Sequence, residues 1–170
     1  MDVLEAMRRR RSVRSYAPRT VEEEKLTEVL EAVRLAPSRH NEQNIRVIVV
    51  RDPQIKKQIR ELADTQSMVE EAGVLLVFCA TGATNFLMPC GQYGYVVDMS
   101  LATGFALLAA AGQGLDTCVI CAFHEEAVKR ILHVPDEMRI VSMAALGYGD
   151  DSSPRPAKKG LEEIVSYDRF

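Results

Sequence analysis

The 170-residue chain has no tryptophan, only three histidines, and only 7 prolines and 10 glycines. So little proline and glycine argues against long disordered regions. The histidines, His40, His124 and His133, are too scattered to indicate a hydrolytic triad or a metal site. An excess of positive charge is also missing. The formal net charge is -3, whereas a general nucleic-acid binder needs a basic face.

Long apolar segments are scarce as well. The longest covers residues 99–111, short of the about 20 residues that a bilayer span needs, so it predicts a buried helix and no membrane partner. The charged start is not followed by the apolar region of a secretory signal. Four cysteines without such a signal indicate a reducing compartment. We expect a soluble cytoplasmic protein with one domain over residues 1–170.

Helical and extended patterns alternate along the chain, which predicts a sheet covered by helices. Helices are predicted at residues 2–11, 20–36, 55–62, 99–111 and 125–132, and strands at 45–50, 74–80, 117–123 and 139–148. Residues 81–95 and 150–160 are predicted to be irregular. Thr20 and Glu23 have the spacing of a capping box. The wholly apolar strand 74–80 predicts burial on both faces.

Five arginines stand close together near the start of the chain, at positions 8, 9, 10, 11 and 14. The first two suit the C-terminal end of a helix, where cations are favourable. Arg10, Ser12 and Arg14 alternate in a segment that looks extended, so their side chains are predicted to point the same way. Two guanidinium groups flanking a hydroxyl suit a phosphate or another compact oxyanion. The cations of residues 155–160 join this site only if the fold returns them to it.

Two other polar features each allow two interpretations. Residues 36–44 crowd hydroxyl, imidazole and amide groups into one loop. Amide donors and acceptors suit the edge of a planar heterocycle, but the same residues also form polar turns that bond to themselves. Cys118 and Cys121 have the spacing of a redox pair or half a zinc site. Within an apolar strand they would face opposite sides, which favours buried, inert thiols.

Taken in order, four segments resemble the FMN-dependent nitroreductase family, and together they cover most of the chain. They are "RRRRSVRSY" (8–16), "EAVRLAPSRHNEQN" (31–44), "DMSLATGFALLAAAGQGLDTCVICAF" (98–123), and "AALGYGD" with "RPAKKGLEEIVSYDRF" (144–150 and 155–170). The resemblance implies an α+β fold, a three-layer sandwich with a central mixed sheet flanked by helices. It also implies an intertwined homodimer with FMN at the interface.

Carried over position by position, the resemblance implies three groups of cofactor contacts. The phosphate would meet Arg10 and Ser12, with Arg11 in the same group, Lys158 or Lys159 closing the site, Gly147 near the ribityl-phosphate, and Arg14 nearer the ring. The ring and ribityl chain would be lined by Pro37, Ser38, Arg39, Asn41 and Gln43. Gln66 would touch the pyrimidine edge, and backbone N–H groups of Ile120, Cys121 and Ala122 would face flavin N5 and O4.

The activity that the resemblance implies is an FMN-dependent NAD(P)H oxidoreductase. NADH or NADPH would deliver hydride to flavin N5, and an electron-poor small molecule, a nitroaromatic or a quinone, would then be reduced in a ping-pong cycle. No side chain need be catalytic, because the cofactor carries the chemistry. The chain also departs from the family pattern: Cys121 and Ala122 stand where glycines are usual, and the segment before the apolar helix is short. Chemistry directed at flavin or another substrate, non-catalytic FMN binding, and a Cys118–Cys121 thiol or zinc site are the alternatives.

Overall fold

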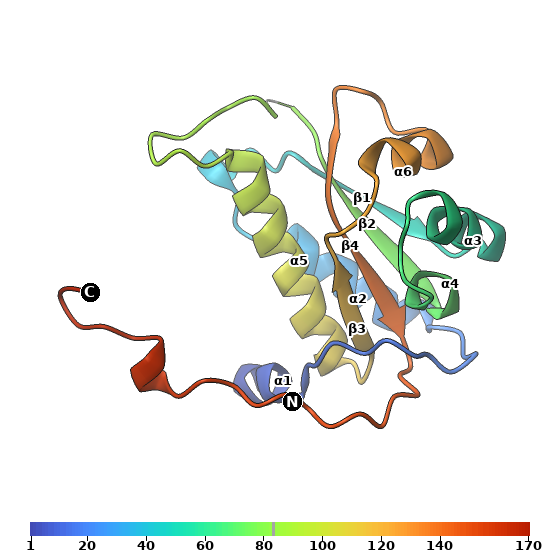
Figure 1. Ribbon diagram of the computed structural model, residues 1–170, viewed down its shortest axis with the longest axis horizontal. Helices are drawn as coiled ribbons and strands as arrows, with labels where there is room; N and C mark the ends of the chain where they lie inside the picture. Colours follow the sequence, from blue (N-terminus) through green and yellow to red (C-terminus); the bar gives the residue numbers. More distant parts are fainter. Residues whose placement is uncertain (83) are drawn as a thin grey trace.

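A computed structural model describes residues 1–82 and 84–170 of the chain. Its sheet has the strand order β1-β2-β4-β3, and every neighbouring pair is antiparallel (Figure 1). The strands are β1 (Ile45–Val50), β2 (Val74–Ala80), β3 (Asp116–Ile120) and β4 (Arg139–Gly147). A parallel bridge joins Ser12 to Thr117 beside β3. The predicted mixed character of the sheet therefore depends on counting the N-terminal segment.

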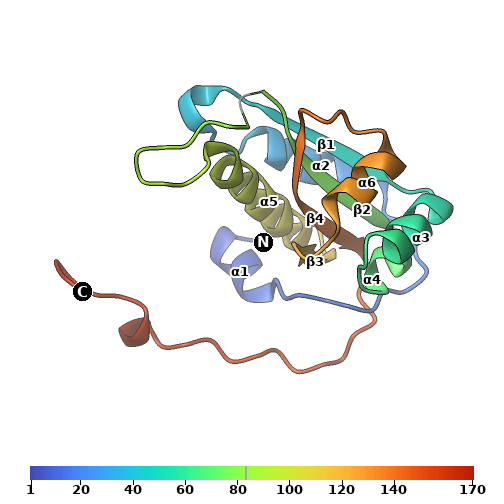
Figure 2. The same cartoon turned by 45° about the horizontal axis from the view of Figure 1, so that its top comes forward.

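Helices cover both faces of this sheet (Figures 1 and 2). One face carries α2 (Glu23–Arg34) and α5 (Gly94–Gly112), and the other carries α3 (Pro53–Leu62), α4 (Met68–Glu71) and α6 (Glu125–Leu132). The short α1 (Val3–Arg9) lies against α5, and single 3-10 turns stand at η1 (Arg39–Asn41) and η2 (Leu161–Glu163). The predicted α+β architecture of three layers is confirmed.

Strand β2 lies at the centre of both hydrophobic layers. All seven of its residues are buried, as its unbroken apolar sequence predicts. Alternate side chains face opposite sides of a strand, so Val77 packs on the α3 and α6 side while Leu76 and Phe78 pack on the α2 and α5 side. One strand thus joins the two cores.

Three predicted bounds are wrong by three residues or more, and the others differ by at most two. The capping box is absent because α2 begins at Glu23 and its N-cap, Glu22, makes no side-chain cap bond. The Glu22 carboxylate instead accepts hydrogen bonds from Tyr148 and Arg19. Strand β3 ends at Ile120 rather than at residue 123. Helix α5 begins at Gly94, inside residues 81–95, which are predicted to be irregular. Residue 83 of that segment lies outside the described residues.

The bond to Glu22 predicts a measurable titration effect. The hydrogen bond from Tyr148 is the largest cause that holds the pKa of the Glu22 carboxyl down at about 2, and hydrogen bonds from the Glu22 backbone N–H and from Arg19 add to it. A depressed carboxyl pKa contributes stability above the unfolded value, and that contribution disappears as the pH falls through the folded one. Tyr148→Phe should therefore raise the Glu22 pKa in an NMR titration. Its destabilisation should be present at neutral pH and vanish near pH 2, while Glu31, paired with Arg34, keeps its own titration curve.

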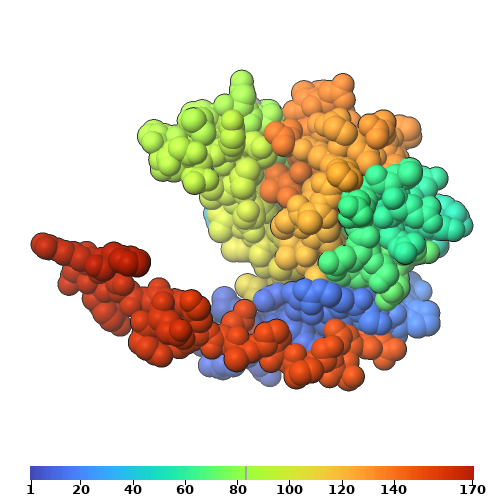
Figure 3. Space-filling model, viewed as in Figure 1, coloured from blue at the N-terminus to red at the C-terminus, as the bar shows by residue number. Residues whose placement is uncertain are grey.

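Helix α5 is the apolar helix that the sequence predicts to be buried. By length and composition alone it could cross a membrane, yet it packs on the sheet and on α2. Its burial is one-sided: Val97, Leu101 and Phe105, spaced four residues apart, are each about 40% exposed. The C-terminal tail also carries exposed apolar residues, including Leu161, and it runs away from the body of the molecule (Figure 3).

Candidate functional site

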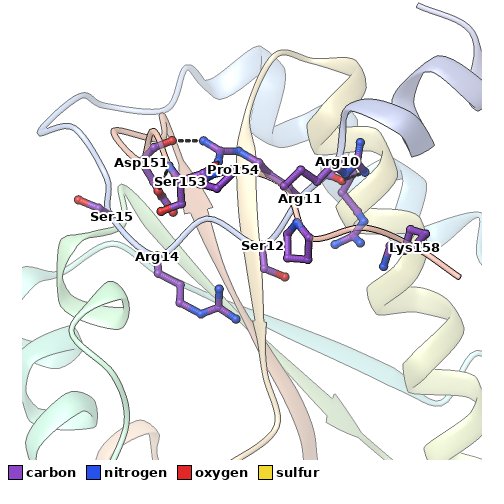
Figure 4. Close-up of a pocket in the computed structure, with 11 residues that line it drawn as sticks. Arg10, Arg11, Ser12, Arg14, Ser15, Asp151, Ser153, Pro154 and Lys158 are labelled. Atoms are coloured by element: carbon purple, nitrogen blue, oxygen red, sulfur yellow. Dashed lines mark hydrogen bonds between the residues drawn. The ribbon is translucent and has the colours of Figure 1, made fainter.

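The N-terminal segment runs along the outer edge of β3. The Val13 N–H donates to the Thr117 carbonyl at 3.0 Å, and the Val13 side chain is fully buried. Because neighbouring side chains of an extended segment alternate, burial of Val13 turns Ser12 and Arg14 outward. Figure 4 shows Arg10, Ser12 and Arg14 on one side of the segment and Arg11 turned the other way. The predicted alternation is confirmed.

A cavity of about 550 Å³ lies between this segment and the loop that follows β4. The segment contributes Arg10, Arg11, Ser12, Arg14 and Ser15, and the loop contributes Asp151, Ser153, Pro154, Arg155, Pro156 and Lys158 (Figure 4). The fold therefore returns the late cations to the early arginines, and two distant stretches of chain build one site.

Two arginines hold these two stretches together. The Arg11 guanidinium donates to the backbone carbonyls of Ser153, at 2.7 Å, and Asp151. In the opposite direction, the Arg155 guanidinium donates to the carbonyls of Met7, at 3.2 Å, and Arg10. Charge-assisted bonds of this kind are stronger than neutral ones. Arg11, which the resemblance assigns to the cofactor, thus donates hydrogen bonds to the backbone of the cavity wall.

The cavity keeps cations without partners. Within residues 1–82 and 84–170, the side chains of Arg10, Arg14 and Lys158 make no hydrogen bond or ion pair with protein atoms. The one carboxylate in the wall, Asp151, has its pKa lowered by a hydrogen bond from Ser153, so it is charged at neutral pH. Three cations against one anion, together with the Ser12 hydroxyl, make the cavity suitable for a multiply charged oxyanion.

The other N-terminal arginines lie outside the cavity. Arg9 donates to the Ala111 carbonyl at 3.1 Å, at the C-terminal end of α5, where free carbonyls and the helix dipole favour a cation. Arg8 is exposed. The cluster therefore divides into cavity residues, wall residues and a cap on α5.

A second pocket, of about 180 Å³, adjoins the first through Arg14, which lines both. It also contains Gln66, Ile120, Cys121 and Ala122, four positions that the resemblance assigns to the ring. Within the described residues, the Ala122 N–H has no hydrogen-bond acceptor. A backbone donor, an amide and a guanidinium thus surround one pocket beside the cationic cavity.

The third predicted group, the 37–43 loop, lies elsewhere. Pro37, Ser38 and Gln43 line a pocket of about 220 Å³ between α2 and α5. The Gln43 N–H donates to Ser38 Oγ at 3.0 Å, and the Gln43 side-chain amide donates to the Asn41 carbonyl at 3.1 Å. The loop is thus a polar turn that bonds to itself, with its outer amide surface exposed.

Helix α5 separates this loop from the cationic cavity. The Arg39 N–H donates to Asp98, in the second turn of α5, whereas Arg9 donates to Ala111 near its last residue. At a rise of about 1.5 Å per residue, these two anchor points are about 20 Å apart along the axis. One chain therefore brings together the residues predicted to contact the phosphate and the pyrimidine edge. It holds the 37–43 loop near the opposite end of α5.

Four predicted site residues lie outside the pockets already described: Arg39, Asn41, Gly147 and Lys159. Gly147 is packed within the protein, where a Cβ would meet the Gly73 nitrogen and the Tyr16 ring, each at 3.1 Å. Lys159 is exposed and does not line the cavity. Arg39 pairs with Glu42 at 2.5 Å. The sequence pattern assigns no role to Asp151, Ser153 or the wall contact of Arg155; only the basic composition of residues 155–160 points there.

The cysteine pair behaves differently from the prediction at one position. Cys118 is buried, and burial raises its pKa, but Cys121 is exposed because β3 ends one residue before it. The prediction of a buried, inert thiol is correct for Cys118 and wrong for Cys121. Over the described part of the chain, no three His, Cys, Asp or Glu side chains gather as a metal site would require.

Comparison with known proteins adds a family match. Residues 7–148 match the sequence model of the nitroreductase family. The chain is 31% identical to an FMN reductase (NAD(P)H) of Bacillus subtilis, over 96% of this chain and 72% of that protein. It is 32% identical to a putative NADH dehydrogenase/NAD(P)H nitroreductase of Methanothermobacter thermautotrophicus, over 100% and 86%. The solved structure of the hypothetical oxidoreductase YcnD from B. subtilis has a TM-score of 0.87 and 30% identity, over 100% of this chain and 75% of that one.

Proposed function

The chain belongs to the nitroreductase family, and from this premise we propose that it reduces an electron-poor small molecule, a nitroaromatic or a quinone, in a ping-pong cycle. It is a flavin-dependent NAD(P)H oxidoreductase with FMN as its cofactor. The observation that carries the assignment of the site is the position of Arg14. This one guanidinium lines both the cationic cavity and the pocket of Gln66 and Cys121, so a phosphate-bearing ring compound can occupy both at once.

The residues present fit FMN. The cations Arg10, Arg14 and Lys158 match a phosphate dianion, and the Ser12 hydroxyl adds a donor. The Ala122 N–H and the Gln66 amide suit the polar edge of a heterocycle. When bound, FMN supplies the redox chemistry, taking reducing equivalents from NAD(P)H and passing them to the acceptor. The protein residues bind and orient it, and we assign no side chain to proton transfer or nucleophilic attack.

We assign the 37–43 loop, apart from the Arg39 side chain, whose guanidinium pairs with Glu42, to the cofactor of a second copy of the chain. A two-fold dimer in which the α5 helices pack antiparallel would bring the N-terminal end of one α5 to the C-terminal end of the other. The loop of one protomer would then meet the ring pocket of its partner, about 20 Å away along one helix. The exposed apolar row Val97, Leu101 and Phe105 supplies the surface for this contact. We place this dimer in the cytoplasm, with residues 1–170 as one domain.

An absorption spectrum recorded before and after anaerobic NADH or NADPH tests the proposed function. A flavin that bleaches with either donor, and is reoxidised by menadione or nitrofurazone, supports it. A flavin that stays oxidised with both donors supports a binding role without turnover. A protein that neither contains nor takes up FMN contradicts the proposal.

One relative makes a second activity specific enough to test. Its name describes reduction of FMN itself, so the same assay should compare free flavin with the quinone as the acceptor. Faster turnover with free FMN or riboflavin than with any nitroaromatic or quinone would move the assignment to a flavin reductase.

The thiols predict a protection pattern that reports on the cofactor position. In protein without FMN, exposed Cys90 and Cys121 should react with a disulfide reagent first. Cys79 should stay unreactive until unfolding, because burial raises its pKa to about 11, and only the thiolate reacts. Saturating FMN should slow Cys121 and leave Cys90 unchanged, as followed by mass spectrometry of the labelled peptides. Equal reactivity of Cys121 with and without FMN would contradict the assignment of the ring to this pocket.

A further inference from the structure

Residues 86–93, which we call the 86–93 hairpin, form a small unit next to the 37–43 loop. An isolated bridge pairs Leu87 with Tyr93, and the Met88 N–H donates to the Gln92 carbonyl at 2.8 Å. The turn closes at Gly91, whose φ of 83° suits glycine. The hairpin exposes Phe86, Leu87 and Tyr93, so it presents an apolar surface beside the loop. Figures 1 and 2 show the segment alongside η1 in both views.

Arg39 joins the hairpin to the loop. Its guanidinium lies over the Phe86 ring, 4.2 Å from the ring centroid, and pairs with Glu42 at 2.5 Å. Its backbone N–H donates to Asp98 at 2.9 Å, and its side chain is only 25% exposed. A guanidinium stacked on an aromatic face attracts the ring electrostatically, and more strongly where water is excluded.

A second contact holds the base of the hairpin less tightly. The Arg139 guanidinium is 5.7 Å from the Tyr95 ring centroid, and its forked bonds go to Glu125 on α6. Arg139 therefore sits close to the limit of about 6 Å for a useful contact, whereas Arg39 lies well within it. Of the two, Arg39 is the stronger constraint on the hairpin.

We propose that Arg39 is a positioning residue for acceptor binding, which fixes the 86–93 hairpin as an apolar wall beside the ring-lining loop through its contact with Phe86. This rests on the proposed function, since the loop lines the ring only in an FMN-bound dimer. The sequence resemblance assigned Arg39 to the cofactor. Its donors are already directed at Glu42 and its face at Phe86, so it acts through the hairpin. A planar aromatic acceptor is the substrate class that such a wall favours.

The test compares Arg39→Met and Phe86→Leu with a control, Arg51→Met. Arg51 also pairs with a glutamate, Glu23, but has no aromatic partner among the described residues. Amide hydrogen exchange is measured on the protein with and without FMN. Loss of the stacking contact should speed exchange at Met88 and Gly94, whose N–H groups bond within the hairpin, by about 3- to 10-fold. The control should leave these rates unchanged.

Kinetics separates positioning from cofactor binding. In both variants the KM for menadione should rise by about 3- to 10-fold, while FMN affinity and the KM for ferricyanide, which needs no planar wall, stay unchanged. Unchanged hairpin exchange in Arg39→Met would overturn the proposal. So would a loss of FMN affinity in that variant, because Arg39 would then be a cofactor ligand. If wild-type protein lacks NAD(P)H-reducible flavin, the proposed function fails. The exchange data alone then decide whether Arg39 positions the 86–93 hairpin.

Discussion

Alanine at Arg10 or Arg14 should weaken FMN binding by about 10- to 100-fold each, because a hydrogen bond to a charged group contributes about 1.5–3 kcal/mol. Neither guanidinium has a protein partner within the described residues. Either substitution should therefore change the stability of the fold little and lower the affinity for FMN strongly. The loss for Arg14 should be seen with riboflavin as well, since Arg14 also lines the ring pocket. The loss for Arg10 should be confined to FMN. Fluorescence titration of the apoprotein measures both affinities.

Arg8→Ala is the matched control for these variants. Arg8 stands in the same cluster but is exposed and lines no part of the cavity, so FMN affinity should be unchanged. Arg11→Ala and Arg155→Ala test the wall, and they should weaken FMN binding together with an increase in proteolysis of the C-terminal tail. Wild-type affinity for FMN in both Arg10→Ala and Arg14→Ala would show that the phosphate does not bind in this cavity.

Glutamate at Leu101 should convert the proposed dimer to a monomer and abolish tight FMN binding. Leu101 is the middle residue of the exposed apolar row on α5. A carboxylate buried there without a partner costs several kcal/mol per copy, so we expect the dimer dissociation constant to rise by about 100-fold or more. FMN affinity should fall with it, because the 37–43 loop would reach the ring only from a partner. Sedimentation across a range of protein concentrations, with a parallel FMN titration, measures both.

The control for this variant is Leu62→Glu. Leu62 is more exposed than Leu101 but ends α3, on the other face of the sheet. The Leu62→Glu substitution should leave both the proposed dimer and the affinity for FMN unchanged. A Leu101→Glu protein that stays dimeric, or a monomer that still binds FMN tightly, would show that the 37–43 loop takes no part in the partner's site.

Local pattern predicted much of the fold. Strand β1, strand β2 and helix α6 have the predicted bounds because each is defined by a short apolar period with turn or helix-end residues at its limits. The capping box failed for a reason absent from the local sequence. The Glu23 carboxylate, which would complete the box, instead pairs with Arg51, 28 residues away. The apolar residues 117–123 likewise do not indicate that β3 ends at Ile120 or that Cys121 is exposed.

The sequence by itself determined the character of the proposed cofactor site: two guanidinium groups and a hydroxyl on alternate positions, an amide-rich loop, and the order of four family segments. These are relations between near neighbours, which backbone geometry alone converts into a shared direction. Only the tertiary structure decided that Arg11 and Arg155 form the cavity wall, that Arg39 stacks on Phe86, and that α5 separates the loop from the cationic cavity. Such contacts join residues far apart in the chain, and no local period records which distant partner a side chain will meet.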